Sequence, residues 1–485
     1  MRLGQTSVVY FLSRLLTSAI GFVATIYFAR VLGADPLGIY YLVISVVAWL
    51  AIAGNIGVSG AITKRVSEGE DQEQFAIAGT SLVAGLFVLV AAGVFVFRPY
   101  VHQYIGQPVA GYVVLILFAS LGWSLVSSLL SGVHLVHIKG ILSPVKMGGQ
   151  SLLQVAALAG GMGLAGLFLG HVAGILLVIG IGGLIVFRQF SELTLPRRHH
   201  YQKLFNYAKF SWLGGLESRM FNYTDIIVLG FFVSSGLIAV YSIAWNIAMF
   251  LIAFSGSISV TLFPEMSERS VEDDLGEVIS LLEDAISYTG LILIPGLVGS
   301  LIIGERLLRI YGDEFTQGTA VLGLLILAAL IRAYQKQFLN TLNAIDRPDL
   351  SFHVNALFVV ANLFLNVILV YLYGWVGAAV ATTLSVSISL LFGYYYLTSI
   401  HSFAVLYTEI GRQMLAALLM GAVVYGGLWI ENTHRLIRHN FATVLILVGI
   451  GAGVYFFVLL GISAKFRRTV SDNLPTDVPL LAGRV

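Results

Sequence analysis

Two basic side chains stacked along one apolar segment are the strongest sign of chemistry in this sequence. A polar ladder with helical steps of i, i+4, i+8 and i+11 is formed by Arg332, Lys336, Asn340 and Asn343. No acidic residue lies on the same segment, and like charges one turn apart repel each other. An anion or a water-filled cavity beside the ladder resolves this repulsion. The ladder therefore predicts phosphate binding, with a bidentate fork from Arg332 and a point charge from Lys336.

A second polar cluster is the stretch "ESRMFNYTD", residues 217–225, inside a run that otherwise reads as membrane-spanning. Each ionised group at the bilayer centre costs about 2.5–3.5 kcal/mol on insertion scales. At 100° per residue, about half of the helix circumference is polar and carries Glu217, Ser218, Arg219, Asn222 and Asp225. We expect this face to line a cavity, with Arg219 contacting substrate. Glu217 and Asp225 either hold Arg219 in an internal ion pair or bind a coupling proton or sodium ion.

Two further segments carry polar residues at helical spacing. Arg14 lies in a stripe from Ser7 to Gly21, and Asn246 follows Tyr241 and Trp245. The predicted substrate-binding set is therefore Arg14, Arg219, Arg332, Lys336, Asn340, Asn222 and Asn246. The alternative is that these groups only mediate helix packing, as small and hydroxylated residues do in lipid.

Other chemistries lack their signatures. No G-x-x-x-x-G-K-[ST] segment occurs, so a P-loop ATPase is excluded, and the absence of cysteine excludes thiolate sites. His134 and His137 have no nearby carboxylate, and His199 and His200 fall in a basic loop. We interpret all four as interfacial. No catalytic residue, metal or cofactor is predicted, and no nucleic-acid partner.

The amino-acid composition indicates the class of protein to which these residues belong. Of 485 residues, 58% are hydrophobic and only 11% are charged, which is typical of a polytopic all-α membrane protein. A spanning helix needs about 20 mostly apolar residues, and about fourteen such runs occur. They begin near Ser7, Gly38, Ala76, Gly111, Lys146, Leu167, Phe210, Gly236, Tyr288, Thr319, Phe352, Val376, Gln413 and Phe441.

The distribution of bases predicts the orientation. With both termini in the cytoplasm, seventeen bases, Lys146 included, fall on that side and six fall outside. The protein is therefore expected to be a multi-pass protein of the cell membrane. Four bases remain within spans: Arg14, Arg219, Arg332 and Lys336.

The spans group into two halves. The predicted organisation is an N-terminal lobe at 1–190, a cytoplasmic linker at 191–209, a C-terminal lobe at 210–400, a helix pair at 401–464 and a cytoplasmic tail at 465–485. The segments "LGADPLGIYYL" and "LGFFVSSGLIAVYSI" occupy corresponding positions in the two halves. Transporters built from such repeats bind substrate near the midplane, between the halves.

Five segments resemble the polysaccharide-transporter branch of the multidrug/oligosaccharidyl-lipid/polysaccharide exporter superfamily. They are "FARVLGADPLGIYYLVIS", "YTDIIVLGFFVSSGLIAVYSIAWNI", "LFPEMSE", "LLRIYGDEFTQG" and "NTLNAIDRPDLSFHVNALFVVANLFLNVILVYLYGWVGAAVATT". The resemblance covers nearly the whole chain, although the last two spans are generic. The residues of these segments, the excess of arginine over lysine and the acidic stretch "SVEDDLGE" resemble those of haloarchaeal members of the family. Those members serve N-glycosylation of surface glycoproteins.

The resemblance implies two six-helix lobes around a central cavity and flipping of a lipid-linked oligosaccharide by alternating access. The carrier would be a polyprenyl or dolichyl phosphate, moved from the cytoplasmic to the outer face, and membrane lipids would surround the protein. Glycosyltransferases and an oligosaccharyltransferase or polymerase would be functional partners. Basic residues in the cavity are a family trait, for which Arg14, Arg219, Arg332 and Lys336 are the candidates.

Two other functions stay open. A cation-coupled multidrug exporter of the same superfamily needs membrane carboxylates, whereas the first six spans contain none and bases outnumber acids four to two within the spans. An integral-membrane glycosyltransferase needs carboxylates at the membrane face and usually a sizeable outer domain, but the predicted outer loops are short.

Overall fold

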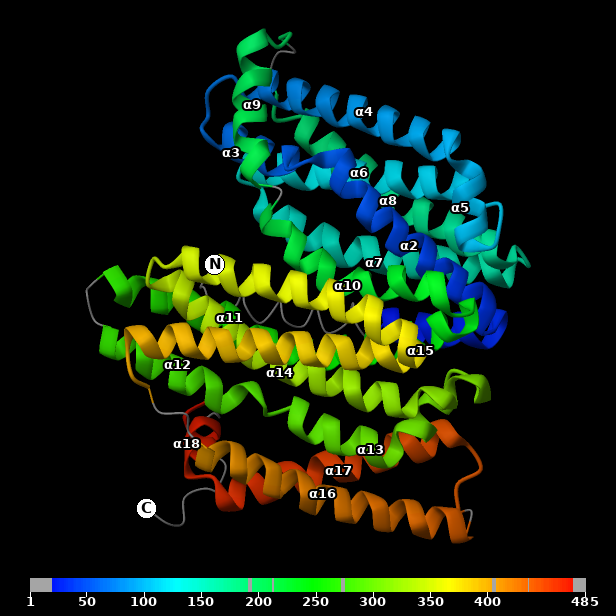
Figure 1. Cartoon of the computed structure of the whole chain (residues 1–485), viewed down its shortest axis with the longest axis vertical. Helices are drawn as coiled ribbons and strands as arrows, with labels where there is room; N and C mark the ends of the chain where they lie inside the picture. The colour runs from blue at the N-terminus through cyan, green and yellow to red at the C-terminus, as the bar shows by residue number, and fades with distance from the viewer. Residues whose placement is uncertain are drawn as a thin grey trace. The chain divides into compact units, whose positions relative to one another are not determined.

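The computed structural model of the chain describes residues 20–190, 194–211, 213–271, 275–403, 407–434 and 436–473. Among these residues every regular element is a helix, and ten helices are long and apolar enough to cross a membrane by length and composition (Figure 1). The prediction of a polytopic all-α membrane protein is therefore confirmed. Arg14 and most of the first predicted span lie outside the described residues, whose first helical stretch is Ile20–Leu32.

The described helices pack into two compact units. The first unit contains the described residues up to Ser242 together with Leu363–Ala378, and the second contains Ile243–Asn362 and the described residues from Ala379 onward. Two long helices, α11 (Ser235–Val271) and α15 (Pro348–Ile400), contribute to both units. The lobe boundaries expected from the sequence remain a prediction.

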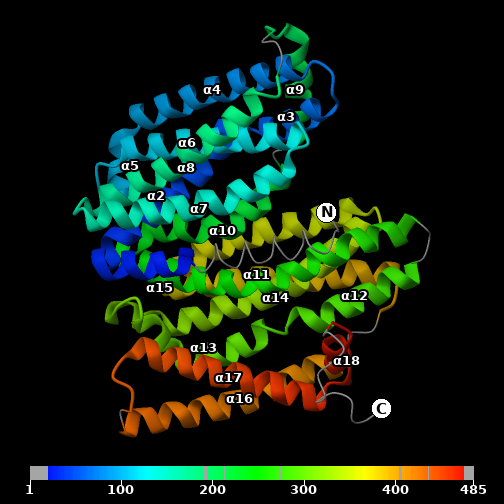
Figure 2. The same cartoon turned by 180° about the vertical axis from the view of Figure 1, so that it is seen from behind.

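The first unit is built on a layer of long apolar helices, with α7 and α8 packed side by side (Figure 2). Its helices are α2 (Ala34–Asn55), α3 (Val58–Ser67), α4 (Gln72–Val96), α5 (Arg98–Ile105), α6 (Ala110–Gly132), α7 (Val136–Ala159), α8 (Gly163–Phe187), α9 (Arg198–Ser211) and α10 (Leu213–Phe232). The segment expected to be a linker forms α9, which packs against α3 and α4.

The second unit contains α12 (Leu275–Thr289), α13 (Leu293–Arg309), the short 3-10 helix η1 (Asp313–Gly318), α14 (Thr319–Ala344), α16 (Tyr407–His434), α17 (Asn440–Ile462) and α18 (Ala464–Asn473). The apolar face of α12, with Val278, Leu282 and Ile286, is buried in a core shared with α14 and α15. The hairpin of α16 and α17 packs against α13 (Figure 1).

The 53-residue helix α15 is two helices joined at a kink. At 1.5 Å per residue a straight helix of this length would extend about 80 Å, far more than the roughly 30 Å hydrocarbon core. Gly374 breaks it with φ 60°, a left-handed value that favours glycine. The two spans predicted from Phe352 and Val376 correspond to its two halves.

The helix that contains the fifth predicted span begins earlier than the span was expected to begin. The fifth span was expected to begin near Lys146, after Pro144, but α7 begins at Val136 and contains Pro144 in its interior. Neighbouring helices can compensate the backbone groups that a proline leaves unpaired, so proline is tolerated inside membrane helices. Lys146 therefore lies well inside α7 and not in a loop.

Candidate functional site

The basic ladder occupies the more open face of α14. Lys336 and Asn343 are exposed and Arg332 and Asn340 are half-buried, whereas the intervening Gln335 is fully buried. Gln335 donates a hydrogen bond to Ser389 Oγ on α15 at 2.5 Å, which helps to fix the buried side of the helix. The spacing seen in the sequence thus translates into a continuous polar surface on one helix.

The guanidinium of Arg332 lies over an aromatic ring. Its Cζ atom is 5.5 Å from the ring centroid of Phe358 on α15, which is within cation–π range. A guanidinium beside an aromatic ring can still donate hydrogen bonds to a phosphate or carboxylate. Phosphate binding by Arg332 stays a prediction.

On α10 the structure places Arg219 against α2. Its Nη1 donates to the carbonyl oxygen of Ala48 at 2.6 Å. Ser218 is exposed and Asn222 is half-buried, with Asn222 Nδ2 donating to the Ser218 carbonyl oxygen at 2.6 Å. Tyr223, expected on the apolar side of this helix, lies within electrostatic range of Arg219.

Asp225 is buried, with only 5% of its surface exposed. Its Oδ2 accepts a short hydrogen bond from the Tyr241 hydroxyl on α11, and its Oδ1 accepts one from Asn366 Nδ2 on α15 at 2.9 Å. All three residues belong to the first unit. Hydrogen bonds from two neutral donors stabilise the ionised carboxylate in this buried position. Glu217, two turns earlier, is half-buried.

Asn366 was missed in the sequence analysis. It lies 141 positions from Asp225, so no helical pattern connects the two residues. The signal that was available is the pair Asn362 and Asn366 at i, i+4 within an apolar run. Asn366 is fully buried, and a buried amide in a membrane helix needs a partner.

Lys146 is the second residue that sequence reasoning missed, because it was assigned to the cytoplasmic side. Its Nζ lies 5.1 Å from the ring centroid of Trp123 on α6. Lys146 is half-buried and is a further base of the first unit besides the predicted Arg219.

A buried hydrogen-bond network lies in the same unit. The Tyr40 hydroxyl is 2.9 Å from His171 Nδ1 and receives a hydrogen bond from Gln154 Nε2 at 3.1 Å. Gln154 Nε2 also donates to the carbonyl oxygen of Leu167 at 2.9 Å. These bonds join α2, α7 and α8. They involve uncharged polar side chains, which the predicted set of site residues did not include.

Asn246 is exposed on α11, between the buried residues Trp245 and Ile247. It belongs to the second unit, as do Arg332, Lys336 and Asn340, whereas Arg219 and Asn222 belong to the first. The structure therefore brings the α14 residues together on one face and places Arg219 and Asn222 on one helix.

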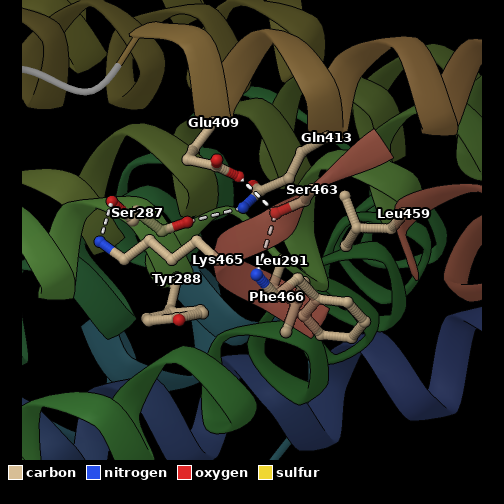
Figure 3. A pocket seen from close by; sticks show the side chains of 9 residues that line it. All are labelled: Ser287, Tyr288, Leu291, Glu409, Gln413, Leu459, Ser463, Lys465 and Phe466. Atoms are coloured by element: carbon tan, nitrogen blue, oxygen red, sulfur yellow. Dashed lines mark hydrogen bonds between the residues drawn. The ribbon is translucent and has the colours of Figure 1, made fainter. Parts of the chain in front are cut away.

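A small polar pocket lies in the second unit where α12, α16 and the α17–α18 junction meet (Figure 3). The empty space in it, with open solvent included, is about 210 Å³. Gln413 Nε2 donates to the Ser287 carbonyl oxygen at 2.6 Å, and Ser463 Oγ donates to Glu409 Oε2 at 2.7 Å. The first bond joins α16 to α12 and the second joins the α17–α18 junction to α16, so the polar groups of this pocket hold these helices together.

A family described as polysaccharide biosynthesis protein matches residues 3–270. Similar curated relatives come from Haloferax volcanii. "Probable flippase AglR" is 30% identical over 483 residues, covering 98% of this chain and 98% of its own. "Probable low-salt glycan biosynthesis flippase Agl15" is 26% identical over 486 residues, covering 99% of this chain and 100% of its own.

Solved structures with a similar fold include the lipid II flippase MurJ in an inward closed conformation. Its TM-score is 0.79 at 16% identity, covering 96% of this chain and 100% of that one. An inward-facing multidrug resistance MATE family transporter gives a TM-score of 0.61 at 13% identity, covering 81% of this chain and 98% of that one. Identities this low show a common fold and nothing further.

Proposed function

The chain belongs to the polysaccharide biosynthesis protein family, and on that premise we propose that it is a flippase that moves a lipid-linked oligosaccharide across the membrane. It is a transporter and not an enzyme, in agreement with the two flippase relatives. The resemblance noted in the sequence is confirmed by the family match. The MATE exporter fold is the less similar of the two structural matches.

The observation that carries the proposal is the open face of α14. Two bases on a membrane helix, Arg332 and Lys336, form a ladder with Asn340, and this face is less buried than its opposite side. Charged residues inside membrane segments ordinarily mark a substrate or ion pathway. The carrier phosphate of a polyprenyl or dolichyl lipid is the anion that fits them.

The remaining predicted residues are further candidates for contacting this substrate. Arg219 and Asn222 on α10, Asn246 on α11 and Arg14 would contact the headgroup or its sugars. Lys146 adds a base to this set. Alternating access would then expose these groups first to the cytoplasm and afterwards to the outer face, with both termini in the cytoplasm.

Transport in that direction does not require ATP. A negative headgroup leaving a negative interior gains about 2.3 kcal/mol per charge per 100 mV. Coupling to an ion would use Asp225 or Glu217, of which Asp225 has the more enclosed setting. A cation-coupled exporter would use the same carboxylate, so Asp225 alone does not separate the two functions.

The biological role we infer is assembly of a cell-surface glycan, such as N-glycosylation of a surface-layer protein. Glycosyltransferases would supply the lipid-linked glycan and an oligosaccharyltransferase or polymerase would consume it. A strain lacking the gene should lose surface glycan and accumulate the lipid-linked form, and the wild-type gene should restore both. Undiminished surface glycan together with increased drug sensitivity would instead support the exporter.

A further inference from the structure

Three side chains of the kind that ligate metals converge in the first unit, where the α3–α4 turn meets the start of α9. Asp71 ends the turn between α3 and α4, and His199 and His200 lie in the first turn of α9. Asp71 Oδ2 is 3.2 Å from His200 Nε2 and 4.0 Å from His199 Nε2. One ligand atom from each residue lies within 4.8 Å of the other two.

The ring of His200 is held in place by its surroundings. Its side chain is 3% exposed, and its ring meets that of Phe75 edge-on at a centroid distance of 4.9 Å. Its Nδ1 accepts a hydrogen bond from the Arg197 backbone N–H at 2.9 Å and lies 3.3 Å from the Arg197 carbonyl oxygen. Metal binding at Nε2 would move the ring proton to Nδ1, which would then donate to the carbonyl and give up the bond from the N–H, the outer-shell arrangement that orients most metal-bound imidazoles.

Asp71 is turned toward the histidines and away from its own helix. It occupies the N-cap position of α4, yet its side chain makes no capping hydrogen bond. Its φ of 51° lies in the left-handed region, which aspartate tolerates better than most residues. The nearby Arg65 is engaged elsewhere, because it donates two hydrogen bonds to Glu68 and thereby holds the pKa of the Glu68 carboxyl below its ordinary value.

The spacing suits a tetrahedral ion. Bonds of 2.0–2.1 Å to nitrogen and oxygen place neighbouring ligand atoms about 3.3 Å apart. The 3.2 Å separation already meets this value, and the 4.0 Å separation needs less than 1 Å of closure. The side chains of His199 and Asp71 are 46% and 50% exposed, so both can move, and water can fill the fourth position.

We propose that Asp71, His199 and His200 bind one divalent transition-metal ion, with zinc as the representative, and that the ion fastens α9 to the α3–α4 turn. The basic neighbours Arg198 and Lys203 oppose any cation. Binding therefore depends on imidazole, which favours zinc, copper and nickel over magnesium and calcium. Both segments occur in loops that the sequence places on the same side of the membrane.

The test uses the full-length protein in detergent, purified with a tag that contains no histidine and stripped with EDTA. Titration with Zn²⁺ against a chromophoric chelator should show one ion bound per chain, and Mg²⁺ in excess should not displace it. Loss of one outer-shell partner alone typically weakens a metal site 10–100-fold. His199→Asn and Asp71→Asn should therefore weaken zinc binding at least about tenfold.

The control is His137→Asn, which removes an exposed histidine on α7 and should bind zinc like the wild type. Zinc should also raise the Tm of the wild type but not that of His199→Asn. His199 is half exposed, so this variant should melt like the metal-free wild type. The proposal is overturned if the wild type binds no stoichiometric zinc, or if His199→Asn binds it equally well. It is equally overturned if Asp71→Asn lowers the Tm while zinc never raises it, since the Asp71–His200 contact is then only a hydrogen bond.

Discussion

Ser235 Oγ, in the first turn of α11, donates a hydrogen bond of 2.8 Å to Asp35 Oδ1 in the first turn of α2. The two residues lie in the segments "LGADPLGIYYL" and "LGFFVSSGLIAVYSI", which hold corresponding positions in the two halves of the sequence. These segments contact each other directly within the first unit. The backbone of Ser235 lies so close to α2 that a Cβ at Gly38 would be 1.7 Å from its carbonyl oxygen.

Gly38→Ala should therefore destabilise the protein, because the added methyl group forces α2 and α11 apart. Overpacking of this kind costs about 1–3 kcal/mol, and we expect a lower Tm in detergent and less protein in the membrane. The matched control is Gly85→Ala in α4, where an added Cβ meets nothing within 4 Å. That change should be neutral or slightly stabilising, since alanine is the better helix former. Equal Tm values for both variants would contradict the close approach.

Arg332→Ala should abolish surface glycan while the protein still accumulates in the membrane. Loss of a charge-assisted hydrogen bond costs about 1.5–3 kcal/mol, on the order of tenfold to a hundredfold in binding. Arg332→Lys should rescue only in part because the bidentate fork is lost, and Lys336→Arg should be nearly normal. The measurement is surface glycan in a complemented deletion strain, normalised to membrane protein.

Arg347→Ala is the matched control for the α14 bases. Arg347 forms an exposed ion pair with Asp349, and exposed pairs contribute about 0–1 kcal/mol. Normal glycan from both Arg332→Ala and Lys336→Ala would mean that these bases are structural and do not bind phosphate.

Asp225→Asn should preserve the fold and remove any ion dependence of transport. The amide has the shape of the carboxyl group, so the contacts with Tyr241 and Asn366 can be rearranged, but the negative charge is gone. The measurement is the rate at which lipid-linked oligosaccharide is flipped in proteoliposomes, with and without a sodium or proton gradient. If the variant keeps a full response to the gradient while Glu217→Gln loses it, Glu217 is the coupling residue.

Single cysteines on α10 should report water in the transport pathway. The chain has no cysteine of its own, so each introduced thiol is unique. Ser218→Cys and Asn222→Cys should react with a membrane-impermeant thiol reagent, whereas Thr224→Cys should not, because Thr224 is only 2% exposed. Equal labelling at the three positions would contradict the prediction that only one face of α10 is exposed to water.

The orientation is tested with a reporter that is active only outside the cytoplasm. Fused after Arg468 the reporter should be silent, and fused after Arg309 it should be active, because the excess of bases is retained on the cytoplasmic side. The expression level of each fusion serves as the internal control. The reverse pattern would overturn both the orientation and the outward direction of transport.

The sequence by itself determined the class of this protein and the face on which the α14 bases lie. A bilayer requires long apolar helices, so composition alone reveals a polytopic protein. The pitch of a helix is fixed, so residues four apart, such as Arg332 and Lys336, must share a face. Family segments along the chain supplied the expectation of a flippase, with which the family match and the two flippase relatives agree.

The tertiary structure decided which distant groups meet. Asp225 and Asn366 are 141 positions apart and Asp71 and His200 are 129 apart, separations over which helical periodicity carries no information. It also decided that Pro144 lies inside α7, which moved Lys146 from a predicted loop to the interior of a helix. A proline predicts a helix end only when no neighbouring helix compensates the backbone groups it leaves unpaired, and packing, which the local sequence does not encode, decides whether one does.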